Sequence, residues 1–139
     1  MKLIFPTLLL TLLAFTSCDK SDDNRPNDIL PSAEYVWVRS SGGIGGITFF
    51  PDDVGYQELL TIDENRFLVT RDGEITEDFI FSLEFEYAQE ASGDVPAYDI
   101  YKVINENFPD QAYYYFWQYN ESYFFSDICC DGFTREFRR

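Results

Sequence analysis

The sequence predicts an all-β domain that folds as an antiparallel up-and-down barrel of about eight strands. Its clearest signal is an apolar row in which every second residue is large: Phe79, Phe81, Leu83, Phe85 and Tyr87. Aromatic residues make up 19% of the 139 residues, and such side chains favour half-buried strands. No window shows the apolar repeat of a long amphipathic helix. Strands joined by short connections fit a closed barrel, which leaves no exposed sheet edge; a two-sheet sandwich is the alternative.

The first part of the domain contains expected strands separated by glycine, proline and aspartate. They cover residues 34–40, 47–50, 56–62, 66–71 and 74–87. The glycine-rich segment 41–46 predicts tight turning at the barrel mouth, and 51–55 predicts a turn or a single helical turn. Asp72-Gly73 lies directly between two strand patterns. It predicts a two-residue hairpin turn in which both residues have positive φ.

The second part continues in the same way. The expected strands cover residues 97–104, 112–119, 122–130 and 133–138. A polar loop over 88–96 and a loop over 105–111 separate the earlier strands, whereas Asn120-Glu121 and Asp131-Gly132 are tight turns. No connection is long enough for the return crossing of a Greek key, so consecutive strands are expected to be neighbours.

The N-terminus resembles a bacterial lipoprotein signal. The uncharged run from Leu3 to Phe15 is shorter than the ~20 apolar residues that a membrane-spanning helix needs, so it predicts the core of a secretory signal. Ser17-Cys18 follows, and small residues before a cysteine resemble a lipobox. We therefore expect cleavage of residues 1–17 and acylation of Cys18. The alternative is an ordinary secreted protein in which Cys18 has no such role.

Residues 18–33 are expected to form a lipidated, acidic, flexible tether that carries a barrel domain over 34–139. The stretch Asp19-Lys20-Ser21-Asp22-Asp23 resembles the signal that sends lipoproteins of the Bacteroidota to the outer face of the outer membrane. The alternative is a solvated linker on a domain that faces the periplasm. The expected location is the outer membrane, with surface display favoured over the periplasmic side.

The charge balance excludes several function classes. The chain has 10 Lys and Arg against 25 Asp and Glu, a net charge of −15, and no His. Nucleic-acid binding needs a basic surface, and most general-base and zinc sites need histidine. The sequence therefore predicts no catalytic residue, metal or cofactor, and a protein that is not an enzyme.

Two segments carry a resemblance to a known family. They are Gly-Gly-Ile-Gly-Gly-Ile-Thr at 42–48 and Cys-Cys-Asp-Gly-Phe at 129–133. Both are similar to segments of small lipocalin-like lipoproteins of the Bacteroidota, and the similarity covers roughly Tyr35 to Arg138. The resemblance implies a calycin-type barrel without catalytic residues. It also implies that Trp37 closes the barrel base by packing under Arg138 or Arg139, as in lipocalins.

Cys129 and Cys130 are the redox-capable residues of the domain. In an extended strand they would point to opposite faces, so a disulfide between them needs a distortion, which the Asp131-Gly132 turn could provide. Two separate thiols, or an intermolecular disulfide through one of them, are the alternatives. A zinc site does not fit two cysteines without histidine.

The abundance of aromatic rings suggests two binding functions. The first is a barrel that holds a small apolar molecule. Its expected lining consists of Phe79, Phe81, Phe85, Phe116 and Trp117. The second is a domain without a small ligand that docks an envelope or host protein. Its expected contacts are Tyr113, Tyr115 and Tyr119.

Overall fold

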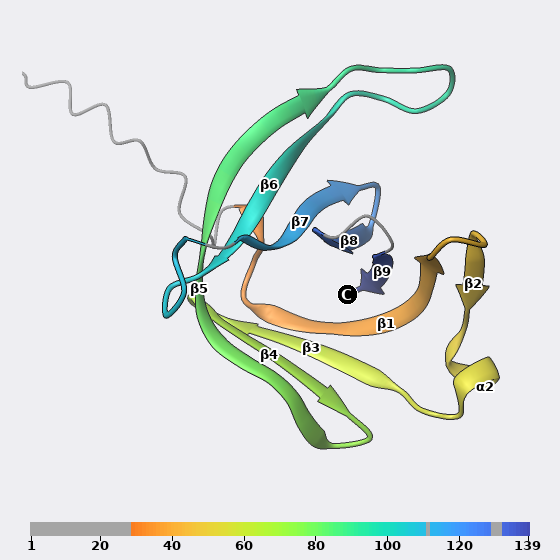
Figure 1. Ribbon diagram of the computed structural model, residues 1–139, viewed down its shortest axis with the longest axis vertical. Coiled ribbons are helices and arrows are strands. Elements are labelled where there is room, and N and C mark those ends of the chain that lie inside the picture. The colour runs from red at the N-terminus through yellow and green to blue at the C-terminus, as the bar shows by residue number, and fades with distance from the viewer. Residues whose placement is uncertain (1–28, 111, 129–131) are drawn as a thin grey trace, which may run out of the picture.

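The computed structural model describes residues 29–110, 112–128 and 132–139 (Figure 1). The strands within these residues are β1 (Ala33–Gly42), β2 (Ile47–Phe49), β3 (Glu58–Asp63), β4 (Arg66–Arg71), β5 (Glu74–Gln89), β6 (Tyr98–Asn105), β7 (Ala112–Tyr119), β8 (Ser122–Asp127) and β9 (Phe133–Arg138). The short helix α2 (Pro51–Val54) follows β2, where a single helical turn was one of the two expectations. The bounds predicted for 66–71, 112–119 and 133–138 are those of β4, β7 and β9.

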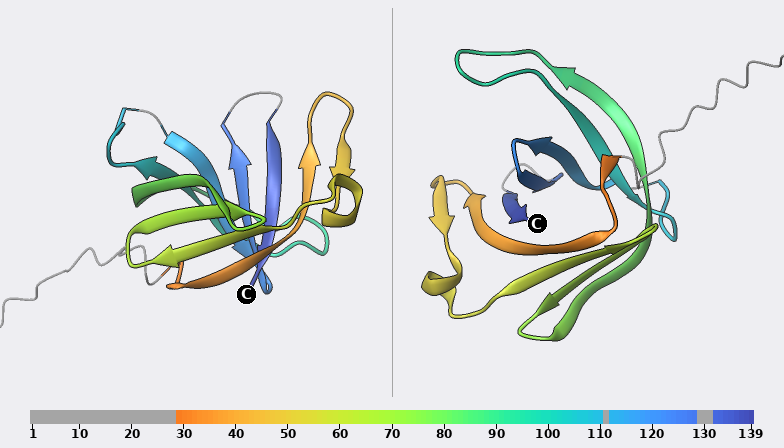
Figure 2. Two further views of the ribbon diagram at one scale, coloured as in Figure 1. Left: turned by 90° about the horizontal axis from the view of Figure 1, so that it is seen from below. Right: turned by 180° about the vertical axis from the view of Figure 1, so that it is seen from behind.

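The strands close into an eight-stranded antiparallel barrel, which confirms the predicted fold class and excludes the sandwich (Figure 2). The sheet order from β3 to β9 follows the chain, and β1 pairs with both β3 and β9. The first half of β1 pairs with β3 from Ala33 to Val36, whereas β9 pairs along β1 from Val36 to Gly42. The extra strand β2 lies outside the closed barrel and pairs with the last residues of β1.

Two predicted turns have the expected backbone geometry. Asp72 and Gly73 have φ values of 49° and 85°, so both residues of the β4–β5 turn lie in the left-handed region. Gly42 has a φ of 145° at the end of β1, and a Cβ built there would lie 2.5 Å from the carbonyl oxygen of Gly132. Glycine at this position therefore allows both the turn and the close approach of β1 to the chain before β9.

The β5–β6 hairpin extends beyond the barrel wall (Figure 1). Along the predicted apolar row of β5, Phe79 and Phe81 are buried, whereas Phe85 and Tyr87 are half-exposed. The register between β5 and β6 shifts between Phe85 and Tyr87. The alternation was thus predicted correctly, but it continues past the end of the enclosed interior.

Aromatic and aliphatic side chains fill the end of the barrel at which β1 begins, here called the base. The largest fully buried side chains are Tyr35, Phe67, Phe81, Phe116, Phe125, Phe137, Leu30, Leu60, Ile62, Val69 and Val103. The opposite end, at which β1 ends and β3 begins, is called the mouth. Glu58, Arg71, Asp127 and Arg135 lie on the strands there.

The folded domain begins before the boundary predicted at residue 34. Leu30 is fully buried in the core, and the Tyr35 hydroxyl donates a hydrogen bond of 2.6 Å to the Pro31 carbonyl oxygen. The Glu64 amide donates a hydrogen bond of 2.9 Å to Ser32 Oγ. Residues 29–33 therefore belong to the barrel domain, because they bury apolar surface against it, whereas residues 18–28 of the predicted tether lie outside the described residues.

No helix among residues 29–110, 112–128 and 132–139 has both the length and the apolar character needed to cross a membrane. The predicted signal peptide, Cys18 and the predicted sorting signal lie outside these residues.

Candidate functional site

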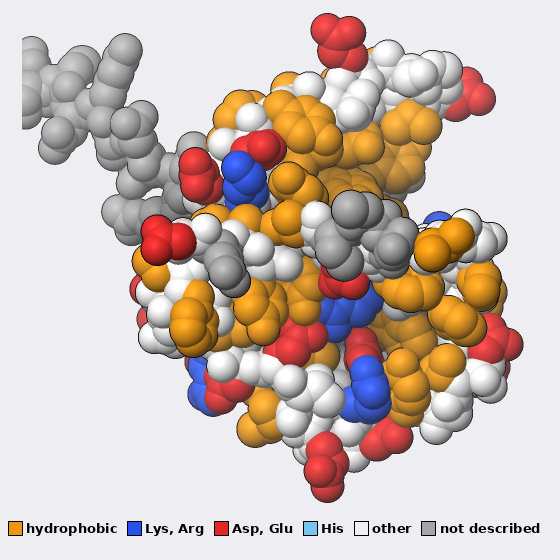
Figure 3. Space-filling model, viewed as in Figure 1, with side chains coloured by type: hydrophobic (Ala, Val, Ile, Leu, Met, Phe, Trp, Pro, Cys, Tyr) orange, Lys and Arg blue, Asp and Glu red, His pale blue; other side chains and the backbone are white. Residues whose placement is uncertain are grey.

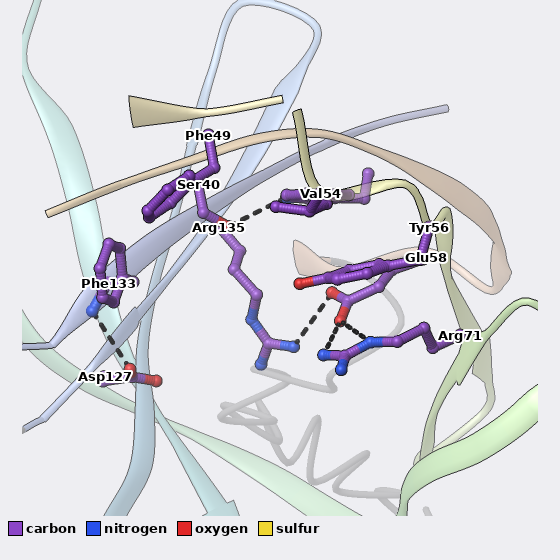
Figure 4. Close-up of a pocket in the computed structure, with 10 residues that line it drawn as sticks. Ser40, Phe49, Val54, Tyr56, Glu58, Arg71, Asp127, Phe133 and Arg135 are labelled. Carbon is purple, nitrogen blue, oxygen red and sulfur yellow. Dashed lines mark hydrogen bonds and ion pairs between the residues drawn. The ribbon is translucent and has the colours of Figure 1, made fainter. Parts of the chain in front are cut away.

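A cavity of about 290 Å³ lies at the mouth of the barrel, beside the segment that contains β2 and α2 (Figure 4). Its lining comes from β1, β2, α2, β3, β4, β8, β9 and the residues that join them. The lining residues are Trp37, Ser40, Phe49, Val54, Tyr56, Glu58, Arg71, Asp127, Phe133 and Arg135. The cavity therefore combines aromatic walls with charged groups of both signs.

Two aromatic pairs form the apolar walls. The rings of Trp37 and Tyr56 are stacked, with centroids 5.5 Å apart and planes inclined by 16°. The rings of Phe49 and Phe133 lie 5.8 Å apart, so β2 contributes one wall and β9 supports it. Trp37 Nε1 donates a hydrogen bond of 3.0 Å to Ser40 Oγ, which fixes the orientation of the indole. Flat apolar surfaces of this kind favour aromatic or apolar ligands.

Glu58 and Arg71 form an ion pair at the cavity. They are register partners on β3 and β4, so both side chains point into the barrel. Arg71 Nη2 and Nε lie 2.7 and 3.1 Å from Glu58 Oε1, and the guanidinium carbon lies 4.1 Å from the centroid of the Tyr56 ring. The hydrogen bond to Glu58 raises the pKa of Arg71. The Glu58 side chain is 4% exposed, whereas that of Arg71 is 45% exposed. Arg71 therefore presents a fixed positive charge to solvent.

Arg135 lies deeper and is held by two carboxylates. Its Nη1 lies 2.8 Å from Glu77 Oε1 and 3.6 Å from Glu58 Oε2. The Tyr114 hydroxyl donates a hydrogen bond of 2.7 Å to Glu77 Oε2, and the Arg135 guanidinium lies over the Tyr114 ring. Burial alone would lower the pKa of Arg135, but the charge of Glu77 and its other neighbours outweigh burial and raise it. Arg135 therefore stays charged.

Burial also raises the pKa of Tyr114, so its hydroxyl keeps the proton that it donates to Glu77. Asp127 accepts a hydrogen bond of 3.1 Å from the Phe133 amide, which ties the end of β8 to the start of β9. Among the described residues, no buried side-chain nitrogen or oxygen lacks a hydrogen-bond partner. The hydrogen bonds of the described buried groups are therefore complete within the protein, which holds these side chains in place.

The face seen in Figure 3 shows basic and acidic side chains next to each other, with hydrophobic side chains around them. In Figure 4, the guanidinium groups of Arg71 and Arg135 converge on the carboxylate of Glu58, with Tyr56 beside it. This arrangement can recognise a molecule that has an apolar or aromatic body and an anionic group, because the rings offer flat surfaces and Arg71 offers a charged donor.

The residues predicted to line a ligand site lie elsewhere. Phe79, Phe81 and Phe116 are packed in the core, Phe85 is half-exposed on the long hairpin, and Trp117 stacks on Phe124. None of them lines the mouth cavity. Phe116 does border a hollow of about 280 Å³ near the base, together with Ile29, Ala97, Tyr98, Asp99, Tyr101 and Gln118.

The expected contact between Trp37 and Arg138 does not form. Trp37 is the register partner of Phe137 and is buried, whereas Arg138 is the partner of the exposed Val36. Register partners in a sheet share a face, so Trp37 and Arg138 lie on opposite faces of the barrel wall. Arg138 instead contacts Glu136 and Ser122. Trp37 packs on Tyr56 at the mouth cavity rather than under an arginine.

Several other predicted residues lie outside the cavity or outside the described part of the chain. Cys18, Cys129 and Cys130 are not among the described residues. Tyr113 is exposed, and Tyr115 and Tyr119 are partly buried. Within the part of the chain that the structure describes, no cluster of three or more His, Cys, Asp or Glu side chains could hold a metal ion.

The charged residues of the cavity were missed because they lie far apart in the sequence. Each nevertheless continues an inward apolar row by one step of two residues: Glu58 precedes Leu60, and Arg71 follows Val69. Arg135 precedes Phe137 in the same way. A charged residue at an inward position was thus the available signal, because burial of such a residue requires a partner.

Comparison with known proteins gave no match. No protein-family model matches the chain, and neither a curated protein nor a solved structure is significantly similar to it.

Proposed function

We propose that this protein is an outer-membrane lipoprotein whose barrel binds a small amphipathic molecule with an apolar or aromatic body and one anionic group. The observation that carries the proposal is the cavity of about 290 Å³ in which Arg71 faces aromatic walls. The resemblance of segments 42–48 and 129–133 to lipocalin-like lipoproteins agrees with a binding function. Fold alone would not support it, because one fold serves many functions.

The size of the cavity favours a small ligand over a long acyl chain. Ligand sites of roughly 300–1,000 Å³ are usual for small molecules, and the mouth cavity lies at the lower end. Toward the base, rings such as Phe67, Phe81 and Phe125 pack into one hydrophobic core, and the described lining of the hollow near the base includes no arginine for an anionic group. A ligand would therefore stay at the mouth, with its body between Trp37 and Phe133.

The charged lining changes the expected ligand from purely apolar to amphipathic. Arg71 is oriented by Glu58 on one side and by Tyr56 on the other, so little side-chain entropy is lost when it binds an anion. A neutral apolar ligand would displace the water that hydrates this guanidinium and would offer no hydrogen-bond acceptor in its place. Such desolvation of a charged group is unfavourable. A carboxylate would replace that water with a charge-assisted hydrogen bond.

The two tryptophans of the chain provide a direct test. Trp37 lines the cavity, whereas Trp117 lies on the outer face against Phe124. When the protein is labelled with fluorotryptophan, each of the two residues gives one resonance in the fluorine NMR spectrum. The variants Trp37→Phe and Trp117→Phe each remove one resonance and so assign both. We expect naphthoate to move the Trp37 resonance and to leave that of Trp117 unchanged.

Naphthamide is the matched uncharged probe, since it keeps the aromatic body and loses the anion. We expect it to bind about tenfold more weakly than naphthoate, and Arg71→Gln to remove this difference. Arg66→Gln is the control, because Arg66 is an equally exposed arginine paired with Asp78 away from the cavity. Equal binding of both probes, or no movement of the Trp37 resonance, would contradict the proposal.

The proposed location depends on Cys18. Acyl chains on this residue would hold the protein at the membrane, since each buried CH₂ contributes roughly 0.8 kcal/mol. We expect the intact mass of the mature protein to correspond to a chain that begins at Cys18 and carries acyl groups. Cys18→Ala should accumulate as the uncleaved precursor. An unmodified mature mass would exclude the anchor, and protease treatment of whole cells then separates surface display from a periplasmic location.

A further inference from the structure

A second hollow, of about 590 Å³, lies on the outer face of the barrel wall, beside the β7–β8 turn. We call it the outer groove. Its lining residues are Arg39, Tyr119, Asn120, Glu121, Ser122, Phe124, Glu136 and Arg138. It shares no residue with the mouth cavity, and none of its residues takes part in the proposed function.

A buried carboxylate holds two arginines at this groove. Glu136 Oε2 accepts a hydrogen bond of 2.6 Å from Arg39 Nε, and Glu136 Oε1 accepts one of 2.9 Å from Arg138 Nη2. Ser122 Oγ donates to the same Oε1 at 2.7 Å. The Glu136 side chain is 4% exposed, whereas those of Arg39 and Arg138 are 47% and 58% exposed.

This geometry does more than neutralise Glu136. One guanidinium would balance the charge of one buried carboxylate, but two are bound to it, so the cluster carries an excess positive charge. Arg39 uses Nε for Glu136, and Arg138 uses Nε and Nη2 for Glu136 and Ser122. Both guanidinium groups line the groove and keep further N–H donors for a ligand. Glu121, the other acid of the lining, lies exposed at the turn and makes the lining formally neutral as a whole, so the excess positive charge is local to the cluster around Glu136.

Two arginines on one buried carboxylate also occur at the mouth, where Arg71 and Arg135 contact Glu58, but single ion pairs are the simpler expectation for this chain. The chain has 10 basic residues against 25 acidic ones, so most cations would be expected to pair singly with surface acids. Arg66 shows that ordinary pattern with Asp78, and Lys102 shows it with Glu86. Two arginines bound to the two oxygens of one carboxylate place several N–H donors at one groove, and an oxyanion such as a phosphate accepts several such hydrogen bonds.

The groove lies toward the base of the barrel, at the end where the described chain begins. The turn between Tyr119 and Ser122 belongs to the same end as the start of β1, since consecutive strands are antiparallel. Twenty-eight residues precede the described chain at this end, where Ile29 and Leu30 pack on the base. An anchor at Cys18 would therefore place the groove on the side of the molecule nearer the membrane.

We propose that the outer groove is a binding site for a phosphate group, held by the guanidinium groups of Arg39 and Arg138 that Glu136 fixes in place. Tyr119 and Phe124 would contact the organic part of the phosphate-bearing molecule. This proposal depends on the geometry of the outer groove and not on the ligand proposed for the mouth cavity. Only the source of the phosphate, a lipid headgroup or a soluble phosphate ester, is linked to the proposed anchor.

Trp117 reports on this site, because its ring stacks on Phe124 with centroids 5.3 Å apart. In the fluorotryptophan-labelled mature protein, held in a detergent without phosphate, we expect glycerol phosphate to move the Trp117 resonance and not that of Trp37. The mouth-cavity proposal predicts the reverse for naphthoate, so failure of one proposal is distinguishable from failure of the other.

Arg138→Gln should weaken glycerol phosphate binding about tenfold, and Arg66→Gln should leave it unchanged. Arg138→Lys keeps the charge but loses the planar donor fork, so we expect intermediate binding from a variant with the least disturbance to folding. An unmoved Trp117 resonance overturns the proposal. Equal affinity in wild type and Arg138→Lys also overturns it, because charge alone would then explain the binding.

The source of the phosphate is tested by moving the lipoprotein from detergent into phospholipid nanodiscs. A lipid headgroup in the groove places the Trp117 resonance at its bound position before any addition, and added glycerol phosphate then has no effect. A soluble ester leaves the resonance at its free position in nanodiscs until it is added. A Trp117 resonance that stays at its free position in nanodiscs, and does not move when glycerol phosphate is added, contradicts both the lipid and the soluble source.

Discussion

The two ends of the barrel interior are built by the same strands but filled with different side chains. Toward the base, the ring of Phe125 contacts those of Phe67 and Phe116 at centroid distances of 5.3 and 5.1 Å. Toward the mouth, the inward positions of the same sheet carry Glu58, Arg71, Glu77 and Arg135. The change from rings to charges occurs within a step or two along each strand.

The two ends therefore differ in role: the base contributes mainly to stability, and the mouth to the proposed recognition of a ligand. Burial of an aromatic side chain contributes about 1.5–3 kcal/mol, so the base supplies most of the folding free energy. Burial of paired charges contributes little net stability, because desolvation offsets their attraction. The mouth network is therefore better explained by the orientation of Arg71 and of the aromatic walls than by stability.

The largest effect is expected at the base. Phe125→Ala should lower the free energy of unfolding by about 3–5 kcal/mol, since the fully buried ring contacts Phe67, Tyr114, Phe116 and Phe137. Urea denaturation measures the change. Phe108→Ala, at an exposed phenylalanine, is the matched control and should alter it by less than about 0.5 kcal/mol. A loss below about 1 kcal/mol for Phe125→Ala would contradict a packed base.

A smaller loss is expected when the mouth network is broken. Arg135→Met should lower the free energy of unfolding by about 3 kcal/mol, because Glu77 then remains as a largely buried carboxylate without its cation. Adding Glu77→Gln removes that charge and should restore part of the loss. A double variant less stable than Arg135→Met alone would show that the carboxylate is not the cause.

Arg71→Gln should separate the two ends most clearly. The substitution leaves the buried Glu58 carboxylate with Arg135, 3.6 Å away, as its remaining cation, so the loss of stability should stay below the ~3 kcal/mol expected for Arg135→Met. Naphthoate binding at the mouth should nevertheless fall about tenfold. Isothermal titration measures the binding and urea denaturation the stability. If the free energy of unfolding fell as much as the free energy of naphthoate binding, Arg71 would act through folding rather than through contact with the ligand.

The smallest effect is expected on the pH dependence of stability, through Glu136 on the outer face of the barrel wall. Burial alone would raise the pKa of Glu136, but hydrogen bonds from Ser122, Arg39 and Arg138 outweigh burial and hold it below its ordinary value of 4.5. The stability contributed by Glu136 is therefore present above that value and is lost as the pH falls through the lower folded-state pKa. Glu136→Gln should flatten the decline of the melting temperature below pH 4.5. An unchanged decline would exclude this residue as a contributor.

The fold could be predicted from local patterns. Asp72-Gly73 specified a hairpin by its conformational requirements, and alternation identified strands such as 112–119. Closure between β1 and β9 is a long-range pairing, and it was inferred only from the short connections. The start of the packed chain was placed too late because the apolar pair Ile29-Leu30 is too short to show a period, and its burial depends on a surface that the rest of the barrel provides.

The candidate site could not be predicted in the same way. Phe79, Phe81 and Phe116 were expected to line a ligand because they are large, but the interior near the base is narrow enough for these rings to fill it. Glu58, Arg71 and Arg135 meet only after three separate strands have found their register. Trp37 was expected to contact Arg138, yet one step in register placed the two on opposite faces.

The proposed role of the mouth cavity is to hold a small molecule. Native mass spectrometry of the mature protein, isolated from its own cells and released from detergent, tests this most directly. We expect wild type and Arg66→Gln to carry an additional small-molecule mass, and Arg71→Gln to have lost most of it. A wild-type protein without that mass, or the same bound mass in Arg71→Gln as in Arg66→Gln, would contradict the claim.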